Sequence, residues 1–498
     1  MLFWIPPPEP QVHDEFGHLL VGDTLAAGRL ANPPHPMARH LETLYVLQQP
    51  SYASIYPIGQ GLALAAGQVL AGHPWVGILL SVGLMSGAIT WMLLRCLPAA
   101  WAAVGGLIAA SAYGLHYDWI NSFWGGALCA CAGALFFGAL CRLRTAPSAL
   151  MGGVAGAAWS LIWLIRPFES ILLFLFGWVC LALLAKRSLR ARRRWLAAAV
   201  LLLLGQMAGG AVTALHNRQV TGSYTTLPYR LSQQLYGVPQ TLLFQAAAPP
   251  PPARFAEARQ MYEWQRYAKE VSSRELHFRI LHVVYVSLKF FAGAWFLAPL
   301  AIAFSLSGDR TVLMAIGLMS CAVLAALLYP FFFPHYIAAY ACVAVFLVTR
   351  GLMALADWKY QGRPVGQFAA ALLIVGGIAA GVPVTRSESA VGLDRTTPGA
   401  GLRASVEQSL AIQGGRHLVL VRYEPGHSFH DEWVYNAADV DRAAIVWCRS
   451  IDPAADAEAV RYFSGRQVWL ASVAKDSAKL SLYHSDHAAH AVLAQPRR

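Results

Sequence analysis

The chain has 498 residues, of which 57% are hydrophobic and only 13% are charged. Because an ordinary soluble domain carries about 25% charged residues, this composition excludes a soluble globular enzyme, a disordered chain and a disulfide scaffold. The mean hydropathy of +0.46 favours an integral membrane protein with many spans. The net charge of +12 would suit a nucleic-acid partner, but the positions of the basic residues favour another explanation.

Long apolar runs follow one another through the first four-fifths of the chain. A membrane-spanning helix needs about 20 mostly apolar residues, and this criterion predicts about ten spans. They lie at 75–95, 99–116, 122–141, 148–165, 169–185, 195–215, 283–306, 311–330, 335–350 and 366–384. A shorter run at 58–71 is expected at the membrane interface. The glycines of Gly152–Gly156 lie inside one span, so we interpret them as a helix-packing site and not as a phosphate loop.

The basic residues fall on alternate connections between these runs. They are Arg95, then Arg142 and Arg144, then the cluster 186–194, then Arg310, and finally Arg350, Lys359 and Arg363. Lys and Arg in short loops face the cytoplasm, so the cluster at 186–194 anchors the topology and nucleic acid is not an expected partner. The same pattern places residues 1–74, the loop 216–282 and the tail 387–498 on the non-cytoplasmic side.

The predicted architecture is an α-helical multi-span membrane protein with a small C-terminal α/β domain outside the cytoplasm. Residues 1–74 form an N-terminal extracytoplasmic segment with juxtamembrane helices, and the Pro-interrupted start suggests a first span whose upstream part is missing. Residues 75–386 form the membrane domain. In the tail 387–498, Ser387–Gly401 is expected as a linker, and short apolar runs alternate with helical patterns. The predicted strands are His417–Val421, Ala443–Trp447 and Gln467–Ala471, with a helix at Asp456–Phe463.

Two further helices are expected on the outer side. Residues 16–30 are predicted to form a short amphipathic helix lying on the membrane. Residues 254–278 form a second amphipathic pattern with Tyr262, Trp264 and Tyr267 along it. These aromatic residues are typical of an interfacial belt, although a lid over an acceptor is an open alternative. The polar stretch 217–229 is a candidate cap for the same region.

An acidic pair, Asp14 and Glu15, stands at the start of the outer N-terminal segment. Two interpretations are open. The carboxylates are either solvated charges at a helix N-terminus, which the helix dipole favours, or a general base. A hydroxyl that attacks an anomeric carbon must lose its proton, and a carboxylate within about 3 Å can take it. A lipid phosphate leaves as a stable anion, so such an inverting transfer needs cationic support and no general acid.

The stretches HDEFGHLLVGDTLAAGRL (13–30) and YPIGQGLALAAGQVLAGHPWVG (56–77) resemble the two ends of the first outer loop of GT-C glycosyltransferases. The similarity covers about residues 12–386 and is greatest to the family-39-like group, which includes protein O-mannosyltransferases and aminoarabinose transferases. It implies a polyprenyl-phosphate-sugar donor, Asp14 as the catalytic base and Glu15 as its catalytic neighbour. Tyr56 is implied at the donor. The family often has a Lys before the Tyr-Pro pair, whereas Ile55 stands here.

Other polar groups in the first outer segment and at outer span ends are candidates for the phosphate contact that this departure leaves open. They are Arg39 and His40, Arg166 in the Arg166–Glu169 stretch, and His335 in the Phe333–Tyr336 stretch; the polar and aromatic run 116–126 lies on the same side. Each group is more typical of interface anchoring when taken alone. Arg166 and Glu169 could also pair with each other. Their convergence on one face favours a shared pocket.

The tail contains the metal-like cluster His427, His430, Asp431 and Glu432. One local cluster without a distant partner is weak evidence for a metal, so we expect a surface loop. No pattern indicates a cofactor or a metal site.

The sequence therefore predicts a glycosyltransferase of the plasma (inner) membrane that acts at its outer face. The acceptor would be a hydroxyl of a glycan, a lipid or a protein. The alternative is a transporter or flippase of lipid-linked sugars. A third hypothesis is a catalytically inactive relative of such glycosyltransferases that scaffolds an assembly. A transporter should place ionisable groups near mid-span, whereas here they gather at the outer ends, which favours an enzyme.

Overall fold

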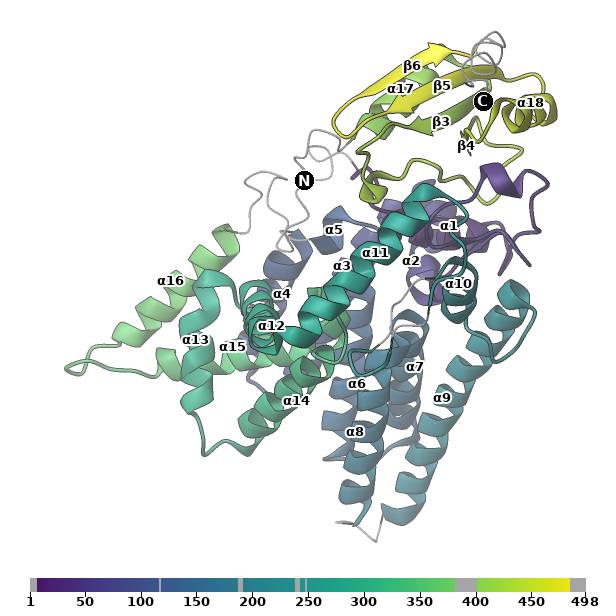
Figure 1. Ribbon diagram of the computed structural model, residues 1–498. Helices are drawn as coiled ribbons and strands as arrows, with labels where there is room; N and C mark the ends of the chain where they lie inside the picture. Colours follow the sequence, from purple (N-terminus) through teal and green to yellow (C-terminus); the bar gives the residue numbers. More distant parts are fainter. Residues whose placement is uncertain are drawn as a thin grey trace.

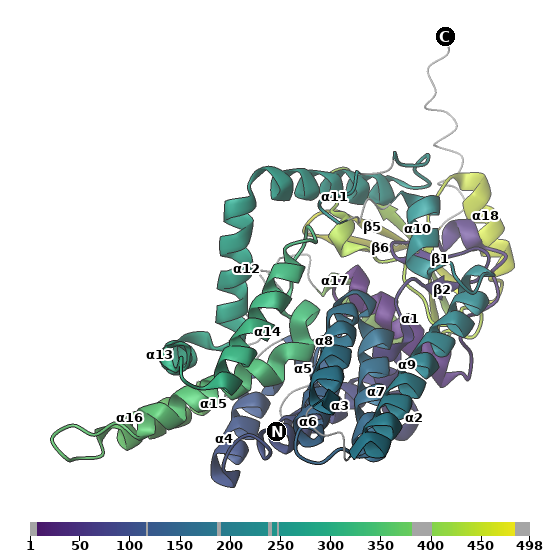
Figure 2. The same ribbon diagram turned by 90° about the horizontal axis from the view of Figure 1, so that it is seen from below.

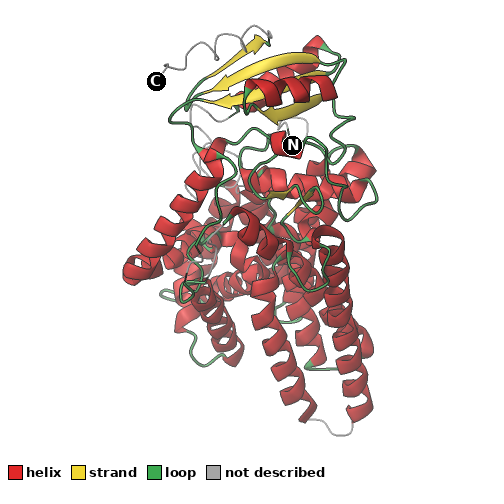
Figure 3. Ribbon diagram, turned by 45° about the vertical axis from the view of Figure 1, so that its right-hand side comes forward, coloured by secondary structure: helices red, strands yellow, loops and turns green. Residues whose placement is uncertain are grey.

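The computed structural model describes residues 7–115, 118–186, 191–237, 242–246, 249–380 and 401–483. A long helical body carries a small α/β domain at one end (Figure 1). When the ribbon is coloured by secondary structure, the main sheet is confined to that domain and the body below it is helical (Figure 3). The expected linker, apart from Gly401, lies outside the described residues.

The helical body follows the apolar runs of the sequence. Its elements are α3 (Pro74–Leu93), α4 (Ala99–Ala109), η2 (Ala110–Leu115), α5 (Asp118–Asn121), α6 (Ala127–Leu143), α7 (Ala149–Ile165), α8 (Pro167–Lys186), α9 (Arg192–Thr221), α12 (Leu276–Phe291), α13 (Gly293–Ser305), α14 (Arg310–Ala326), η4 (Pro334–Tyr340), α15 (Ala341–Ala356) and α16 (Val365–Ala379). Within the described residues, four helical segments are long and apolar enough to cross a membrane, and the bent pair α12–α13 adds a fifth if it is one span. On α8, Leu175, Val179 and Leu183 are each more than half exposed. Large exposed apolar surfaces of this kind suit contact with lipid, and the chain is a multi-pass membrane protein.

The span predicted at 283–306 is wrong as a single straight helix. The axes of α12 and α13 meet at 104°, and Gly293 at the junction has a positive φ of 58°. A residue with a side chain adopts this conformation with difficulty, whereas glycine adopts it freely. The sequence pattern did not reveal the bend because the apolar composition continues through it.

The expectation of helix packing at Gly152 is confirmed. A Cβ built on Gly152 would stand 2.2 Å from the backbone oxygen of Ala198 in α9. Any side chain at this position would therefore push α7 and α9 apart. The small residue allows the two backbones to approach closely, as is common between membrane helices.

The elements within residues 13–71 and 228–274 assemble at the end of the body that faces the α/β domain (Figure 1). They comprise α1 (His13–Ala26), η1 (Ala38–His40), β1 (Val46–Leu47), β2 (Ala53–Ser54), α2 (Ile58–Ala71), α10 (Pro228–Tyr236) and α11 (Ala256–Arg274). The hydroxyl of Ser51 donates to the carbonyl of Val220 (2.8 Å), and the side-chain amide of Gln265 donates to the hydroxyl of Tyr45 (2.9 Å). These contacts join the N-terminal segment to the loop 216–282.

Both amphipathic helices differ from their predicted form. The first begins at His13 and not at residue 16, and it does not lie free on a membrane surface. Leu20 and Val21 are both buried, and the ring of Phe16 stacks on Tyr435 of the C-terminal domain at 4.4 Å. Apolar residues on several sides of the helix thus find protein partners. The second helix, α11, ends at Arg274, and the chain turns sharply into α12 (Figure 2).

The C-terminal domain is a four-stranded sheet with the order β4-β3-β5-β6. Its elements are α17 (Leu402–Gln413), β3 (His417–Tyr423), η5 (Phe429–Asp431), β4 (Ile445–Arg449), α18 (Pro453–Tyr462), β5 (Gln467–Val473) and β6 (Ala478–Leu482). Strand β3 is parallel to β4 and β5, and β6 is antiparallel to β5. The three predicted strands and the predicted helix are present, whereas α17 and β6 were not predicted. Leu418, Leu420 and Cys448 pack in one buried cluster with Leu41 and Val46, so one face of the sheet rests on the N-terminal segment.

Candidate functional site

Glu15 joins the start of helix α1 to the chain at Phe123. Its Oε2 accepts hydrogen bonds from the backbone amides of Gln11 (2.9 Å) and Val12 (3.4 Å), and its Oε1 accepts from the amide of Phe123 (3.2 Å). The first amides of a helix lack partners within the helix, so a carboxylate in the first turn satisfies donors there. Glu15 is fully buried. These contacts hold the first turn of α1, which also carries Asp14, against the chain at Phe123.

Asp14 is the accessible member of the acidic pair. Its side chain is 33% exposed, and the hydroxyl of Tyr56 donates a hydrogen bond to its Oδ1. His13 Nε2 lies 3.5 Å from the same oxygen. Gly17 makes this arrangement feasible, because a Cβ at that position would come within 2.7 Å of the Tyr56 ring. The missing side chain therefore lets Tyr56 lie flat against α1.

The phenol and imidazole groups next to Asp14 are neutral. Burial raises the pKa of Tyr56, and the negative charge of Asp14 raises it further, so the phenol stays protonated. Burial lowers the pKa of His13 and lowers that of His18 to about 3, with a further lowering from the positive charge of Arg166. The His18 ring stacks on Tyr56 with centroids 4.2 Å apart. Asp14 is thus the acidic group in a shell of aromatic rings and uncharged imidazoles.

Arg166 supplies positive charge at the same place. It follows the last residue of α7, and its guanidinium carbon lies 4.5 Å from the centre of the Tyr336 ring. Among the described residues Arg166 forms no ion pair, so the pairing with Glu169 that the sequence left open is not formed in this structure. A guanidinium without a carboxylate partner is well suited to a phosphate. Beside Tyr336, buried His335 packs on Trp124 with centroids 5.5 Å apart.

A loop of the C-terminal domain covers this group of residues. We call residues 427–432 the roof loop. The ring of His430 stacks over His13 with centroids 5.8 Å apart, and Trp264 of α11 lies edge-on to His430 at 5.1 Å. The prediction of a surface loop is wrong, because His427 and Glu432 are only 4% and 3% exposed. The C-terminal domain, α11 and α1 therefore meet above Asp14.

In the part of the chain that the structure describes, no three His, Cys, Asp or Glu side chains are grouped so that they could hold a metal ion. Glu432 is instead engaged with Arg449 and with the hydroxyl of Tyr423.

Arg39 and His40 lie elsewhere. Arg39 is exposed and lines a cavity next to the C-terminal domain. His40 is buried, and its Nδ1 lies 2.8 Å from the carbonyl oxygen of Arg449. No contact found in the described structure joins either residue to Asp14. Of the predicted site residues, the structure thus gathers Asp14, Glu15, Tyr56, Arg166 and His335, while Arg39 and His40 belong to the domain junction.

Sequence reasoning missed the contribution of the roof loop and gave Trp264 only as one of two alternatives. His430 was noticed as part of a local cluster, but its place over His13 depends on how two distant parts of the chain pack. A local pattern carries no signal for such a contact.

The overall fold has counterparts among solved structures. The structure of ArnT from Cupriavidus metallidurans in the apo state is similar, with a TM-score of 0.52 and 12% sequence identity over 94% of this chain and 89% of that chain. ArnT bound to undecaprenyl phosphate matches with a TM-score of 0.50 and 13% identity over 93% of this chain and 89% of the other. The Archaeoglobus fulgidus oligosaccharyltransferase is a more distant match, with a TM-score of 0.47 and 10% identity over 94% of this chain and 64% of that chain. No family model and no curated protein sequence matches the chain.

Proposed function

We propose that this protein is a membrane glycosyltransferase that moves a sugar from a polyprenyl-phosphate donor to an acceptor hydroxyl. The observation that carries the proposal is the accessible carboxylate of Asp14 with a cation nearby. Tyr56 donates a hydrogen bond to this carboxylate. Asp14 and Arg166 both lie close enough to His18 to affect it electrostatically, so the two charged groups share a neighbour. One base and one phosphate-binding cation are the two groups that the reaction needs. The GT-C fold, and the undecaprenyl phosphate bound by ArnT, support the same class of donor.

In the proposed reaction the acceptor oxygen attacks the anomeric carbon from the face opposite the phosphate. The acceptor hydroxyl gives its proton to Asp14 as the new C–O bond forms. The bond between the anomeric carbon and the phosphate oxygen breaks, and the electron pair leaves with the phosphate. Arg166 stabilises the negative charge that develops there, while His335 and Tyr336 shape the wall beside it. A single displacement of this kind inverts the anomeric centre.

An apolar cavity of about 380 Å³ supports a lipid-linked donor. Its lining comes from α12, α13, α14 and α15, and it includes Phe291, Met319 and Leu347. Helix α15 directly follows η4, the element that carries His335 and Tyr336. A polyprenyl chain in this cavity would approach the phosphate-binding wall from the membrane side.

The proposed reaction takes place at the outer face of the plasma membrane. Basic residues of this kind favour the cytoplasmic side, and Arg95 follows the C-terminal end of α3 while Arg142 lies in the last turn of α6. The C-terminal domain would then be extracytoplasmic, and the acceptor would be a glycan, lipid or protein hydroxyl on that side.

Transfer by the purified protein tests this proposal against transport. In detergent no compartments exist, so a transporter has no measurable product. We expect donor-dependent release of polyprenyl phosphate together with a glycosylated acceptor when membrane extract supplies the acceptor pool. Absence of both products, combined with movement of the lipid-linked sugar across reconstituted vesicles, would contradict the proposal.

A further inference from the structure

A second cavity lies at the junction of the C-terminal domain with the N-terminal segment and α11. Its volume is about 300 Å³. We call it the junction cavity. It is lined by Arg39, Glu42, Arg254, Phe255, Ala256, Glu257, Val421, Arg422, Tyr423, Arg449, Ser450 and Ile451. Asp14 and Arg166 are not among these residues, so this cavity is separate from the site described above.

The topology of the sheet places the junction cavity where ligands bind in many α/β domains. Its lining includes the last residues of β3 (Val421–Tyr423) and the end of β4 with the two residues that follow (Arg449–Ile451). These strands are adjacent and parallel. Ligands of open parallel sheets bind in the crevice outside the carboxyl ends of the strands.

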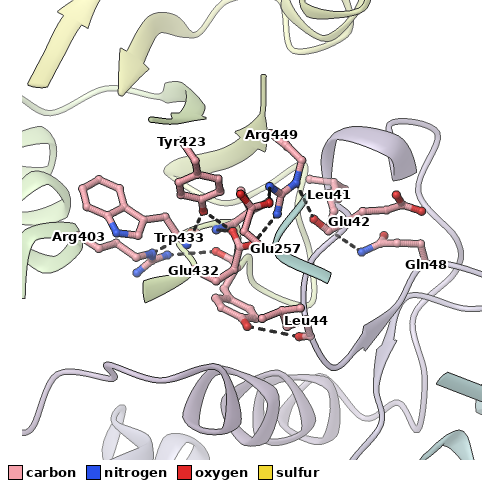
Figure 4. Close-up of polar contacts among 12 residues, drawn as sticks. Leu41, Glu42, Leu44, Gln48, Glu257, Arg403, Tyr423, Glu432, Trp433 and Arg449 are labelled. Carbon is pink, nitrogen blue, oxygen red and sulfur yellow. Dashed lines mark hydrogen bonds and ion pairs between the residues drawn. The ribbon is translucent and has the colours of Figure 1, made fainter. Parts of the chain in front are cut away.

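Four arginines and two glutamates line the junction cavity, so its wall is positive. Arg449 is satisfied internally, because it lies between Glu257 and Glu432, each 2.5 Å away (Figure 4). Arg254 pairs with Glu42 at 2.8 Å. Neither Arg39 nor Arg422 has a hydrogen-bond acceptor or an ion-pair partner identified within the described residues, and both are exposed.

The start of α11 also lies in the cavity wall. The helix dipole there favours negative charge, and Glu257 in the first turn already supplies one carboxylate, which pairs with Arg449. The guanidinium groups of Arg39 and Arg422 therefore remain the uncommitted positive charges of the cavity wall.

We propose that the junction cavity binds a phosphate group carried by the acceptor, with Arg39 and Arg422 as its principal ligands. Assigning this group to the acceptor rests on the proposed function, whereas binding itself does not. Planar guanidinium groups match the oxygens of a phosphate in two-bond contacts. A cavity of this size accommodates a phosphate with part of a sugar or headgroup.

The contacts of Arg449 connect this cavity to the proposed active site. Arg449 lines the cavity and binds Glu432, the last residue of the roof loop. The same loop carries His430, which stacks over His13 beside Asp14. An occupied cavity would hold the roof loop in place, so that a phosphorylated acceptor would assemble the site at which its own hydroxyl reacts.

Phosphate binding by the purified full chain in detergent tests this inference. The probes are inorganic phosphate and a hexose 1-phosphate, with the neutral hexose as the control, and sodium chloride keeps the ionic strength constant. We expect both anions to raise the thermal midpoint of the wild type in a saturable way. The double variant Arg39→Gln/Arg422→Gln should require about tenfold or more higher phosphate for the same shift, because two charge-assisted contacts are lost. Arg442→Gln, an exposed arginine elsewhere in the same domain, should bind like the wild type.

Two further measurements identify the source of the phosphate and distinguish a failure of this inference from a failure of the proposed glycosyltransferase function. The same measurement in nanodiscs with and without an anionic phospholipid distinguishes a lipid headgroup from a free sugar phosphate, since a headgroup already in the cavity would reduce the response to added hexose 1-phosphate. Asp14→Asn should bind phosphate like the wild type, so binding survives even if Asp14 is not the base. Equal phosphate responses in the wild type and the double variant, or no response in the wild type, would overturn the inference.

Discussion

The hydroxyl of Tyr56 donates to Oδ1 of Asp14, joining the residue that precedes Pro57 and α2 to the first turn of α1. This bond aims the accessible carboxylate. The Tyr56 ring stacks on His18, and it can lie there because Gly17 has no side chain to displace it.

Replacing Tyr56 with Phe should weaken catalysis in a protein that still folds. Phe keeps the ring packing but loses the hydroxyl, and hydrogen bonds to charged groups contribute roughly 1.5–3 kcal/mol. We expect kcat to fall about 10- to 100-fold, while the thermal midpoint falls but stays above the assay temperature. Tyr52→Phe is the matched control, because its hydroxyl donates to the Asn436 carbonyl. If the two variants retain the same kcat, Tyr56 does not orient the base.

Glu15→Gln should act mainly on stability. Glu15 accepts three backbone hydrogen bonds while fully buried, and an amide cannot accept at both of its terminal atoms. We expect a loss of roughly 1–3 kcal/mol, measured as a lower thermal midpoint in detergent. Glu263→Gln removes an exposed pair with Arg259 and should cost less than about 1 kcal/mol. An unchanged midpoint together with abolished turnover would make Glu15 a catalytic group instead.

The acidic pair shows how far sequence reasoning reached. Asp14, Tyr56 and Arg166 could be predicted because they belong to local motifs at the ends of apolar runs. The different exposure of Asp14 and Glu15 could not, since it depends on packing and on the Phe123 amide, which another part of the chain supplies.

The fold likewise divides into features that local sequence predicted and features that only tertiary packing determines. Apolar runs and the alternation of basic loops predicted the helical body, and short apolar runs predicted three strands. The bend at Gly293 and the burial of α1 under the C-terminal domain arise from tertiary packing. Arg39 and His40 were predicted as phosphate ligands near Asp14 because of their side-chain chemistry. The folded chain places them at the junction with the C-terminal domain instead.

Acidification should destabilise the protein through His18. Burial lowers the pKa of His18 from 6.5 to about 3, so between these values the unfolded chain binds a proton that the folded protein excludes. The stability contributed by the neutral ring is complete above pH 6.5 and is lost as the pH falls. At pH 5 the loss is on the order of 2 kcal/mol.

The variant His18→Phe keeps the stacking on Tyr56 and cannot titrate. Its thermal midpoint should fall less than that of the wild type between pH 7 and pH 5 in the same detergent. The same pH dependence in both proteins would show that His18 is not the group responsible.

Arg449 should be important for the junction of the two parts of the protein. Its replacement by Met leaves Glu257 and Glu432 buried without their cation. Breaking a buried ion pair from one side costs about 3–5 kcal/mol, so we expect a large drop in thermal midpoint and a displaced roof loop. Adding Glu432→Gln should recover part of the loss. A double variant that is less stable than the sum of both single changes would contradict this account.

The most direct measurement compares sugar transfer by the wild type and by Asp14→Asn, purified in the same detergent with the same polyprenyl-phosphate donor and acceptor pool. Asparagine keeps the shape and the contact with Tyr56 but cannot take the acceptor proton. We predict that transfer falls to background while the thermal midpoint and donor binding stay close to those of the wild type. Near-normal turnover by the folded variant would contradict the assignment of Asp14 as the base.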